Sequence, residues 1–536
     1  MTGPTTGETT GPTTPDAVGP EGRVRPRTRR GRLARAASGL LVLGLAGGAL
    51  AGATQLGAAG ARAVDAPGVE VDPTPVTLQC PGPVVLPQRA ERGDAAFDPS
   101  PVEPQVALDA VTAAGDGAGA LAVLPLGGTT AVRDAPAGGG AVRVQGGETP
   151  FVVRAQPGDS LPVVAATGTS VVTDGDARGL AAASCRAPSS AHWFVGGSTA
   201  VGATSTLVLS NPGLTAAQVE LEIFGPRGPV DPTAAQHLVA PGATTTVDLG
   251  GAAADQAAIV VHVTVTGGQV AAHVQDTVVR GFTPAGTDLV VGGAAPATRQ
   301  VVTGVVAAES TVGSPDAPAL RLLAPGPEQT VARVTLLGGD GPVTLPGADR
   351  VTLAGSEVTD VPLGGLPAGV YTVVVDADVP VVAGVVTSRT GAPGALDDEP
   401  RVDRAWSAAT PLAEHGAIAL PAGVGARVVV GAVGQDADAQ GDGSATLRVL
   451  GSDGQVLSEH RVRVDAGTTG AWDVADLAPD AAGVELEPVG GVPLVWAVAL
   501  TLEQEDGPLV ATLDPVGVVG ATGAVAVRED ARPARG

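Results

Sequence analysis

The chain has 536 residues, 44% of them hydrophobic, which suffices for several cores and predicts about three or four domains. Its formal net charge of −24 opposes binding to nucleic acid and to anionic lipid headgroups, so neither DNA nor RNA is expected as a partner. All 31 basic residues are arginines, which excludes mechanisms that use a lysine.

The N-terminal residues predict an exported protein. Residues 1–35 combine a Thr-, Gly- and Pro-rich start with an arginine cluster and are expected to form a disordered cytoplasmic leader. Residues 36–61 carry no charge and are long enough to cross a bilayer as one helix. Arginines before this segment and acidic residues after it place the N terminus inside and the bulk of the chain outside the cell.

The sequence leaves the fate of this segment open. A retained single-pass helix would anchor the protein in the cytoplasmic membrane, which would then be a partner. Small-residue patterns at 51–53 and 61–63 also resemble signal-peptidase sites, and cleavage there would release a secreted protein. A buried core helix is the third interpretation.

Residues 64–190 predict a less regular β region. Short apolar runs at 121–126, 141–144, 151–153 and 161–172 alternate with Gly, Pro and Asp turns. The only two cysteines, Cys80 and Cys185, bracket this region. In an exported chain an isolated pair most simply forms one structural disulfide, so we expect this bridge instead of a metal site or a catalytic thiol.

A repeated order of segments follows. Residues 207–209 form a short apolar run, and Val219, Leu221 and Ile223 then alternate with polar residues before a Gly-Pro turn. Alternation at period two between Gly and Pro turns is typical of half-buried antiparallel strands. The same order returns from Leu320 and from Val428, and a period of this length suits one sandwich per unit.

The predicted fold is therefore all-β, with tandem antiparallel β-sandwich (Ig-like) domains after a single N-terminal transmembrane or signal helix. The predicted parts are the leader 1–35, the membrane or signal segment 36–61, the β region 64–190, the sandwiches 191–300, 301–400 and 401–520, and the tail 521–536.

Two weak metal sites can be read from the sequence. If Gly267-Gly268 forms a two-residue hairpin turn, His262 lies opposite His273 on the outer face, where two imidazoles can hold a metal ion or respond to pH. The loop with Asp436 and Asp438 starts like a calcium loop but has a leucine where the bidentate glutamate belongs. A solvated surface pair and a solvated turn are the simpler interpretations.

Two tryptophans are candidates for stacking on a ligand. Trp193 and Trp406 each precede a repeated unit, and an exposed indole packs well on a sugar ring. Because aromatic residues make up only 2% of the chain, a plug at a sandwich end or domain junction is the favoured alternative.

Catalytic motifs are missing from the sequence. The six histidines are dispersed, no pair has the spacing of a zinc protease, and neither a nucleophile elbow nor a phosphate-binding loop occurs. We therefore expect no enzyme activity, no catalytic residues and no cofactor.

Several local motifs resemble a known family. They are Ala-Ala-Ala-Ser-Cys at 181–185, Pro188, Trp-Phe-Val-Gly-Gly at 193–197 and Leu-Val-Leu-Ser-Asn-Pro at 207–212. Together they are similar to an uncharacterised exported family of high-GC Gram-positive bacteria, catalogued as domain of unknown function 5719. The resemblance is strongest between residues 80 and 274. It implies a membrane-linked envelope protein and supplies no catalytic residues.

These observations predict a non-catalytic protein of the cell envelope that acts as a structural or protein-interaction module, with an envelope protein or a glycan as its partner. A carbohydrate-binding envelope protein is the alternative. A hydrolase that acts on an envelope polymer through unaligned Asp and Glu residues is the least favoured interpretation.

Overall fold

The computed structural model describes residues 68–71, 75–87, 98–115, 118–157, 163–394, 396–412, 415–434, 440–517 and 523–526. These residues form antiparallel β-sheets and two single-turn helices, α2 (Leu249–Ala252) and α3 (Val474–Leu477), which confirms the predicted all-β class. None of the helices within these ranges is both long and apolar enough to cross a membrane. The leader 1–35 and the segment 36–61 lie outside the described residues.

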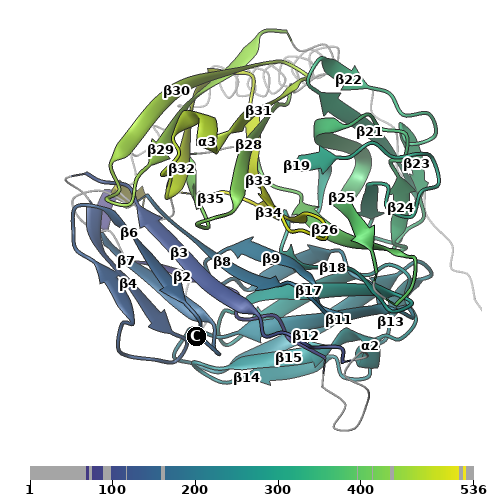
Figure 1. The fold of residues 1–536 in the computed structure, drawn as a ribbon, viewed down its shortest axis with the longest axis horizontal. Helices are drawn as coiled ribbons and strands as arrows, with labels where there is room; N and C mark the ends of the chain where they lie inside the picture. The colour runs from purple at the N-terminus through teal and green to yellow at the C-terminus, as the bar shows by residue number, and fades with distance from the viewer. Residues whose placement is uncertain are drawn as a thin grey trace, which may run out of the picture. The chain divides into compact units, whose positions relative to one another are not determined.

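The chain divides into two compact units. The smaller unit comprises Met1–Val69 and Ala524–Gly536, and its described residues belong to β1 (Gly68–Val71) and β36 (Gly523–Ala526), which pair as a two-stranded sheet. The larger unit comprises Glu70–Gly523 and consists of four sandwiches, here called A to D in chain order. Figure 1 shows the strands of this larger unit.

Sandwich A consists of two four-stranded sheets, with strand orders β2-β7-β4-β5 and β6-β3-β8-β9. Its strands are β2 (Val76–Gln79), β3 (Gln105–Thr112), β4 (Ala118–Pro125), β5 (Arg133–Ala135), β6 (Gly140–Gln145), β7 (Phe151–Pro157), β8 (Val164–Val172) and β9 (Gly179–Ser184).

Sandwich B repeats this plan, with the order β10-β16-β12-β13, to which β14 adds on β12, and the order β15-β11-β17-β18. Its strands are β10 (Ala191–Val195), β11 (Ala203–Ser210), β12 (Ala217–Gly225), β13 (Gly228–Val230), β14 (Gln236–Val239), β15 (Thr244–Asp248), β16 (Val260–Thr266), β17 (Ala271–Arg280) and β18 (Thr283–Val291).

Sandwich C joins its two sheets through one long strand, β25, whose first part pairs with β19 and β21 and whose second part pairs with β20 and β26. Its strands are β19 (Ala297–Ala307), β20 (Ala319–Leu323), β21 (Thr330–Gly338), β22 (Gly341–Val343), β23 (Arg350–Leu353), β24 (Thr359–Pro362), β25 (Gly369–Pro393) and β26 (Pro400–Ala408).

Sandwich D has the orders β30-β29-β32-β27-β35 and β31-β28-β33-β34. Its strands are β27 (Gly416–Ala419), β28 (Gly425–Ala432), β29 (Asp442–Leu450), β30 (Val456–Asp465), β31 (Thr469–Asp473), β32 (Gly483–Gly491), β33 (Leu494–Leu502), β34 (Leu509–Leu513) and β35 (Val516–Gly517).

The alternation seen in the sequence is what fills the cores. In β12 the side chains of Val219, Leu221 and Ile223 are buried, while Glu220 and Glu222 between them are exposed. Successive strand residues point to opposite faces, so the apolar set packs against the facing sheet. Because aromatics are scarce, aliphatic side chains dominate these cores.

The sequence predicts a less regular β region at 64–190, but sandwich A has the same design as the other sandwiches. Its strand orders match those of sandwich D without β35, which makes it a fourth unit of the same design instead of a less regular region. Two facts hide this in the sequence. β5 has only three residues, and β8 and β9 are almost entirely buried, so they show no alternation of polar and apolar residues.

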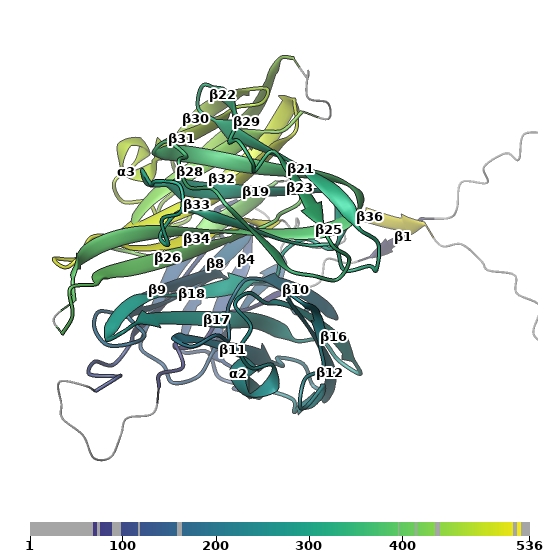
Figure 2. The same cartoon turned by 90° about the vertical axis from the view of Figure 1, so that its right-hand side faces the viewer.

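One edge strand from each of the four sandwiches lies at a common meeting point. β9 contacts β18 and β34, and β26 contacts the same two strands, so that one edge strand from each sandwich faces two others. Both views show these four strands close together (Figures 1 and 2). We call these strands and the residues directly flanking them the junction.

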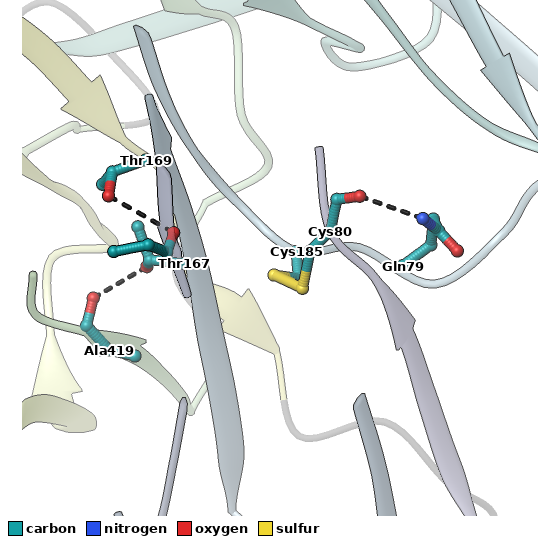
Figure 3. The surroundings of a disulfide bond; sticks show 7 residues. Gln79, Cys80, Thr167, Thr169, Cys185 and Ala419 are labelled. Atoms are coloured by element: carbon teal, nitrogen blue, oxygen red, sulfur yellow. Dashed lines mark hydrogen bonds between the residues drawn. A yellow bond between two sulfur atoms is a disulfide. The ribbon is translucent and has the colours of Figure 1, made fainter. Parts of the chain in front are cut away.

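A disulfide links the two sheets of sandwich A. Cys80 follows β2 in one sheet and Cys185 follows β9 in the other, and the two are bonded as expected (Figure 3). Nearby, the Thr167 hydroxyl on β8 donates to the carbonyl oxygen of Ala419 on β27, at 2.7 Å. The bridge therefore holds sandwich A closed beside its contact with sandwich D.

Replacing both cysteines, as in Cys80→Ser/Cys185→Ser, is expected to destabilise the protein. The bridge closes a loop with a sequence separation of 105 residues, and the loop-entropy model assigns such a loop about 4 to 5 kcal/mol. Urea unfolding followed by tryptophan fluorescence measures the change. The reduced wild-type protein should unfold at the same urea concentration as the variant, and an unchanged midpoint in both would contradict the expectation.

Candidate functional site at the sandwich junction

One buried carboxyl group joins three sandwiches. Asp403 lies on β26 with 0% exposure, and its Oδ2 accepts hydrogen bonds from the backbone N–H of Leu180 on β9, at 3.3 Å, and of Val510 on β34, at 2.7 Å. Both donors belong to edge strands, whose outer N–H groups lack a partner within their own sheet. The Asp403 carboxyl therefore binds the outer N–H groups of β9 and β34 that a further strand in each sheet would otherwise bind.

A second set of hydrogen bonds joins sandwiches B and C. Asp288 on β18 accepts the backbone N–H of Trp406 at 2.6 Å, and Asp276 on β17 accepts its indole Nε1–H at 2.9 Å. Arg404 contacts Asp276 at 3.4 Å. The guanidinium carbons of Arg321 and Arg404 lie 5.1 and 5.9 Å from the Trp406 ring centroid, a distance at which the ring quadrupole attracts a cation.

A third set joins sandwich A to sandwich D. The guanidinium of Arg178, which is 1% exposed, donates to both carboxylate oxygens of Asp506, at 3.0 and 2.7 Å. Arg186 donates to Asp514 at 2.7 Å and to the carbonyl oxygen of Gly292 in sandwich B at 3.1 Å. Such bidentate and charge-assisted bonds are the strong ones in proteins, because they also fix geometry.

The approach of β9 to β18 depends on a glycine. A Cβ atom at Gly179 would lie only 2.5 Å from the carbonyl oxygen of Thr287. No side chain fits at that distance from a backbone atom, so glycine is what lets the two strands come together here.

Burial changes the ionisation of the junction carboxyls. It raises the pKa of Asp403 to about 7, against the lowering effect of three backbone hydrogen bonds and of Arg178. Burial also raises the pKa of Asp288 well above its usual value, and the neighbouring charges of Asp403 and Asp276 raise it further. Among the described residues, none makes a hydrogen bond to the Oδ1 atom of Asp288 or of Asp403. Because both side chains are at most 2% exposed, a substrate cannot reach them in the folded protein.

A small cavity of about 230 Å³ lies between sandwiches A and B, next to Cys80. Arg186, His192 and His273 line it together with Gln79. Burial lowers the pKa of His273 to about 4 and also lowers that of His192, whose Nε2 bonds to the carbonyl oxygen of Val270 at 2.9 Å. Both imidazoles are therefore neutral near pH 7, and the cavity can hold only a small polar molecule.

The predicted pairing of His262 with His273 is wrong. His262 lies on β16, opposite Trp193 and Glu222, whereas His273 lies on β17 in the other sheet, opposite Val208 and Val291. Residues 267–270 cross from one sheet to the other instead of closing a hairpin, so the two imidazoles do not face each other. No group of three or more metal-binding side chains occurs within the described ranges.

The two predicted ligand-stacking tryptophans differ in their surroundings. Trp406 is 4% exposed and enclosed by the junction, so it has no free face for a sugar and plugs the contact between sandwiches B and C. Trp193 is half-buried and stacks on His262, with ring centroids 4.0 Å apart, and its role in ligand stacking stays a prediction. Asp436 and Asp438 lie outside the described residues.

Sequence reasoning missed the charged residues of the junction, although it named Trp406, which lies there, and His273 and Cys80, which line the cavity. Asp276 and Asp288 lie opposite each other on the consecutive strands β17 and β18, but Arg178 and Asp403 come from distant parts of the chain, and no spacing links them to this pair. One usable signal exists. An acidic residue inside an apolar strand, such as Asp288 before Leu289-Val290-Val291 in β18, indicates a buried hydrogen-bond partner.

Comparison with known proteins finds a family without an assigned role. A family model described as "Family of unknown function (DUF5719)" matches residues 140–441. No curated protein matches the chain. Among solved structures, the pilus adhesin SpaC from Lactobacillus rhamnosus GG shares 9% identity at a TM-score of 0.09, over 76% of this chain and 55% of the adhesin. The chain thus spans about half the length of that adhesin, and a score this low carries no argument.

The Asp403→Asn variant is expected to flatten the dependence of stability on pH. A carboxyl whose pKa is raised from 3.8 to about 7 on folding stays protonated in the folded state while the unfolded chain ionises. Wild-type stability should therefore fall as pH rises from about 4 to about 7, by roughly 4 kcal/mol from this group at most. The asparagine cannot ionise, so the variant should lose this decline and exceed the wild type in stability at about pH 8.

Unfolding by urea at a series of pH values measures the effect. A part of the slope should remain in the variant, because burial also raises the pKa values of Asp288 and Asp514. Asp340→Asn, in an exposed turn, is the matched control and should leave the slope unchanged. Equal slopes for wild type and Asp403→Asn would show that this carboxyl is ionised throughout.

Proposed function

This chain belongs to the DUF5719 family, whose function is unknown, and we propose that it acts as a rigid, non-catalytic structural or protein-interaction module of the cell envelope. The observation that carries this proposal is how the junction uses its ionisable side chains. Asp288 and Asp403, the buried acids with the most strongly raised pKa values, bind backbone N–H groups of neighbouring sandwiches instead of lining an open cleft. Such a joint favours sandwiches held in fixed positions over domains that move to close on a substrate.

In this proposal the contacts at the junction hold the four sandwiches rigidly together. Inter-domain contacts within a chain normally permit motion unless they are large or specifically bonded. Here the four sandwiches share bonds through Asp403, Trp406 and Arg178, and each of these residues is at most 4% exposed. Loops at the outer ends of the sandwiches are then held at constant spacing, which is a property that a binding module needs.

The cellular location forms part of the same proposal. An arginine-rich leader, an uncharged segment at 36–61 and a structural disulfide together favour an exported chain, because disulfides persist outside the reducing cytoplasm. We favour a single-pass membrane protein with its bulk outside the cell, and a secreted protein after signal cleavage is the alternative. The membrane is the first partner in the former case, and an envelope protein or glycan is the second.

A cross-linking experiment on whole cells tests this function. The chain has no lysine, so a carboxylate-directed reagent that cannot enter the cell is required. We expect it to join the wild-type protein to one envelope component. Arg178→Met removes the guanidinium that binds both carboxylate oxygens of Asp506 and should reduce the yield several-fold by loosening the junction.

The control is Glu222→Gln, an exposed change on β12 that should leave the yield unchanged. Equal yields from the wild type and Arg178→Met would contradict a role that depends on the junction. Release of soluble fragments from cell-wall polymer by the purified protein would contradict the non-catalytic part and favour the hydrolase alternative.

Carbohydrate binding is the second candidate function, and the cavity beside Cys80 favours it. Its volume of about 230 Å³ is below that of sites for drug-sized ligands, so it fits one small polar ring. Its neutral imidazoles and the Gln79 amide offer the donors and acceptors that sugar hydroxyls use. Trp406 is not available for stacking, which weakens this candidate relative to the first.

If a sugar occupies this cavity, His273→Ala should reduce its affinity several-fold. Titration calorimetry of the full chain with single monosaccharides measures binding, which for so small a ligand is expected near millimolar Kd. His237→Ala, on β14 away from the cavity, is the control and should bind like the wild type. The absence of heat for every sugar, or equal affinity for both variants, would remove this candidate.

A further inference from the structure

Strand β30 forms a long exposed sheet edge in sandwich D. It has ten residues, stands at the end of its sheet and pairs only with β29. Its main contacts are with β28, β29 and β31, all of the same sandwich. A strand at an edge presents unpaired N–H and C=O groups along one side and is a template for another strand.

The matching edge is blunted in the other three sandwiches. In sandwich A it is β5, with three residues, and in B and C it is divided into β13 and β14 and into β22 and β23, none longer than four residues. Pro229 in β13 and Pro342 in β22 also remove a backbone donor. β30 contains neither proline nor glycine from Val456 to Asp465. Among the four matching edges, three are therefore short or divided, and β30 is the long continuous one.

The exposed side chains of β30 carry an ordered charge pattern. Val462 and Val464 are buried, whereas Glu459, Arg461 and Arg463 between and before them are exposed. Arg463 lies 3.9 Å from Asp442 in its own sandwich. Arg461 has no ion-pair partner among the described residues, so this edge presents an unused cation.

Next to β30 there is an excess of negative charge. Arg448 on β29 is in contact with three carboxylates, those of Glu459, Glu485 and Glu487, at 3.2, 3.1 and 2.9 Å. Glu485 is also bonded to His415, at 2.5 Å. The Glu459 side chain is 61% exposed, so its carboxylate can accept a second cation.

We propose that β30 pairs antiparallel with β30 of a second copy of this chain, about a two-fold axis at His460. In this register Glu459 of each copy lies directly opposite Arg461 of the other, so both cross-strand pairs are of opposite charge. The unpaired Arg461 then meets the carboxylate-rich cluster around Arg448. Ser458 and Val462 face each other on the inner side, which keeps the alternation of the sheet.

The neighbouring registers are disfavoured by the same charges. An axis at Arg461 pairs Glu459 with Arg463 but places the two Arg461 side chains directly opposite each other. An axis at Val462 places Arg461 opposite Arg463 and Glu459 opposite Asp465, and like charges directly opposite are destabilising. An axis at Val464 pairs Arg463 with Asp465 and leaves Arg461 without an acidic partner. The charge pattern therefore selects His460 as the centre.

Charge reversal tests the pairing and its register. Sedimentation velocity of the full chain in mild detergent, over a wide range of concentration, should show a monomer–dimer equilibrium. Arg461→Glu places like charges opposite each other twice per dimer and should raise the dimer Kd about tenfold or more. Glu459→Arg should do the same. The double variant E459R/R461E restores opposite charges in this register alone and should regain the wild-type Kd.

Arg463→Glu is the control that separates the registers. It should leave the dimer Kd almost unchanged for an axis at His460 and should weaken the dimer for an axis at Val464. Circular dichroism of each variant checks that the sheets persist. A chain that stays monomeric at every concentration, a dimer indifferent to Arg461→Glu, or a double variant that fails to recover would overturn the proposal.

Discussion

The larger unit depends on satisfying the backbone polar groups of four sheet edges. Each sandwich ends in an edge strand, β9, β18, β26 or β34, whose outer N–H and C=O groups would otherwise face apolar protein or water. An unpaired buried backbone group costs about as much as a lost hydrogen bond. The junction meets this demand with side chains, since the carboxyls of Asp288 and Asp403 accept the N–H groups that a neighbouring strand would have bound.

This solution has an energetic consequence at the most buried acids. A carboxyl that accepts backbone N–H groups is normally stabilised in its charged form, yet burial dominates at Asp403 and Asp288 and raises both pKa values. The charge of Arg178 compensates only in part at Asp403, because its guanidinium is already bonded to the carboxylate of Asp506. The junction therefore fixes the arrangement of the sandwiches at the expense of some stability near neutral pH.

The sequence predicted local features better than distant ones. Val219, Leu221 and Ile223 alternate in the chain and are buried in β12, and the Cys80–Cys185 bridge followed from the cysteine count. The fourth sandwich was hidden because β8 and β9, buried throughout, do not alternate. His262 and His273 were misplaced because a Gly-Gly pair is compatible with a hairpin and with a crossing between sheets, and only packing decides between them.

The junction also imposes an order on how the protein is completed. The Ser184 hydroxyl at the end of β9 bonds to the carbonyl oxygen of Asp514, which is 330 residues further along the chain, and Arg178 binds Asp506 across 328 residues. Sandwich A, made before sandwich D, thus cannot form these bonds until the last sandwich has been synthesised. Contacts of such high sequence separation form slowly. Until they form, the partly folded chain exposes the Arg178 side chain and the unpaired edge of β9. Folding of this protein therefore calls for protection of sandwich A until the rest of the chain has been made.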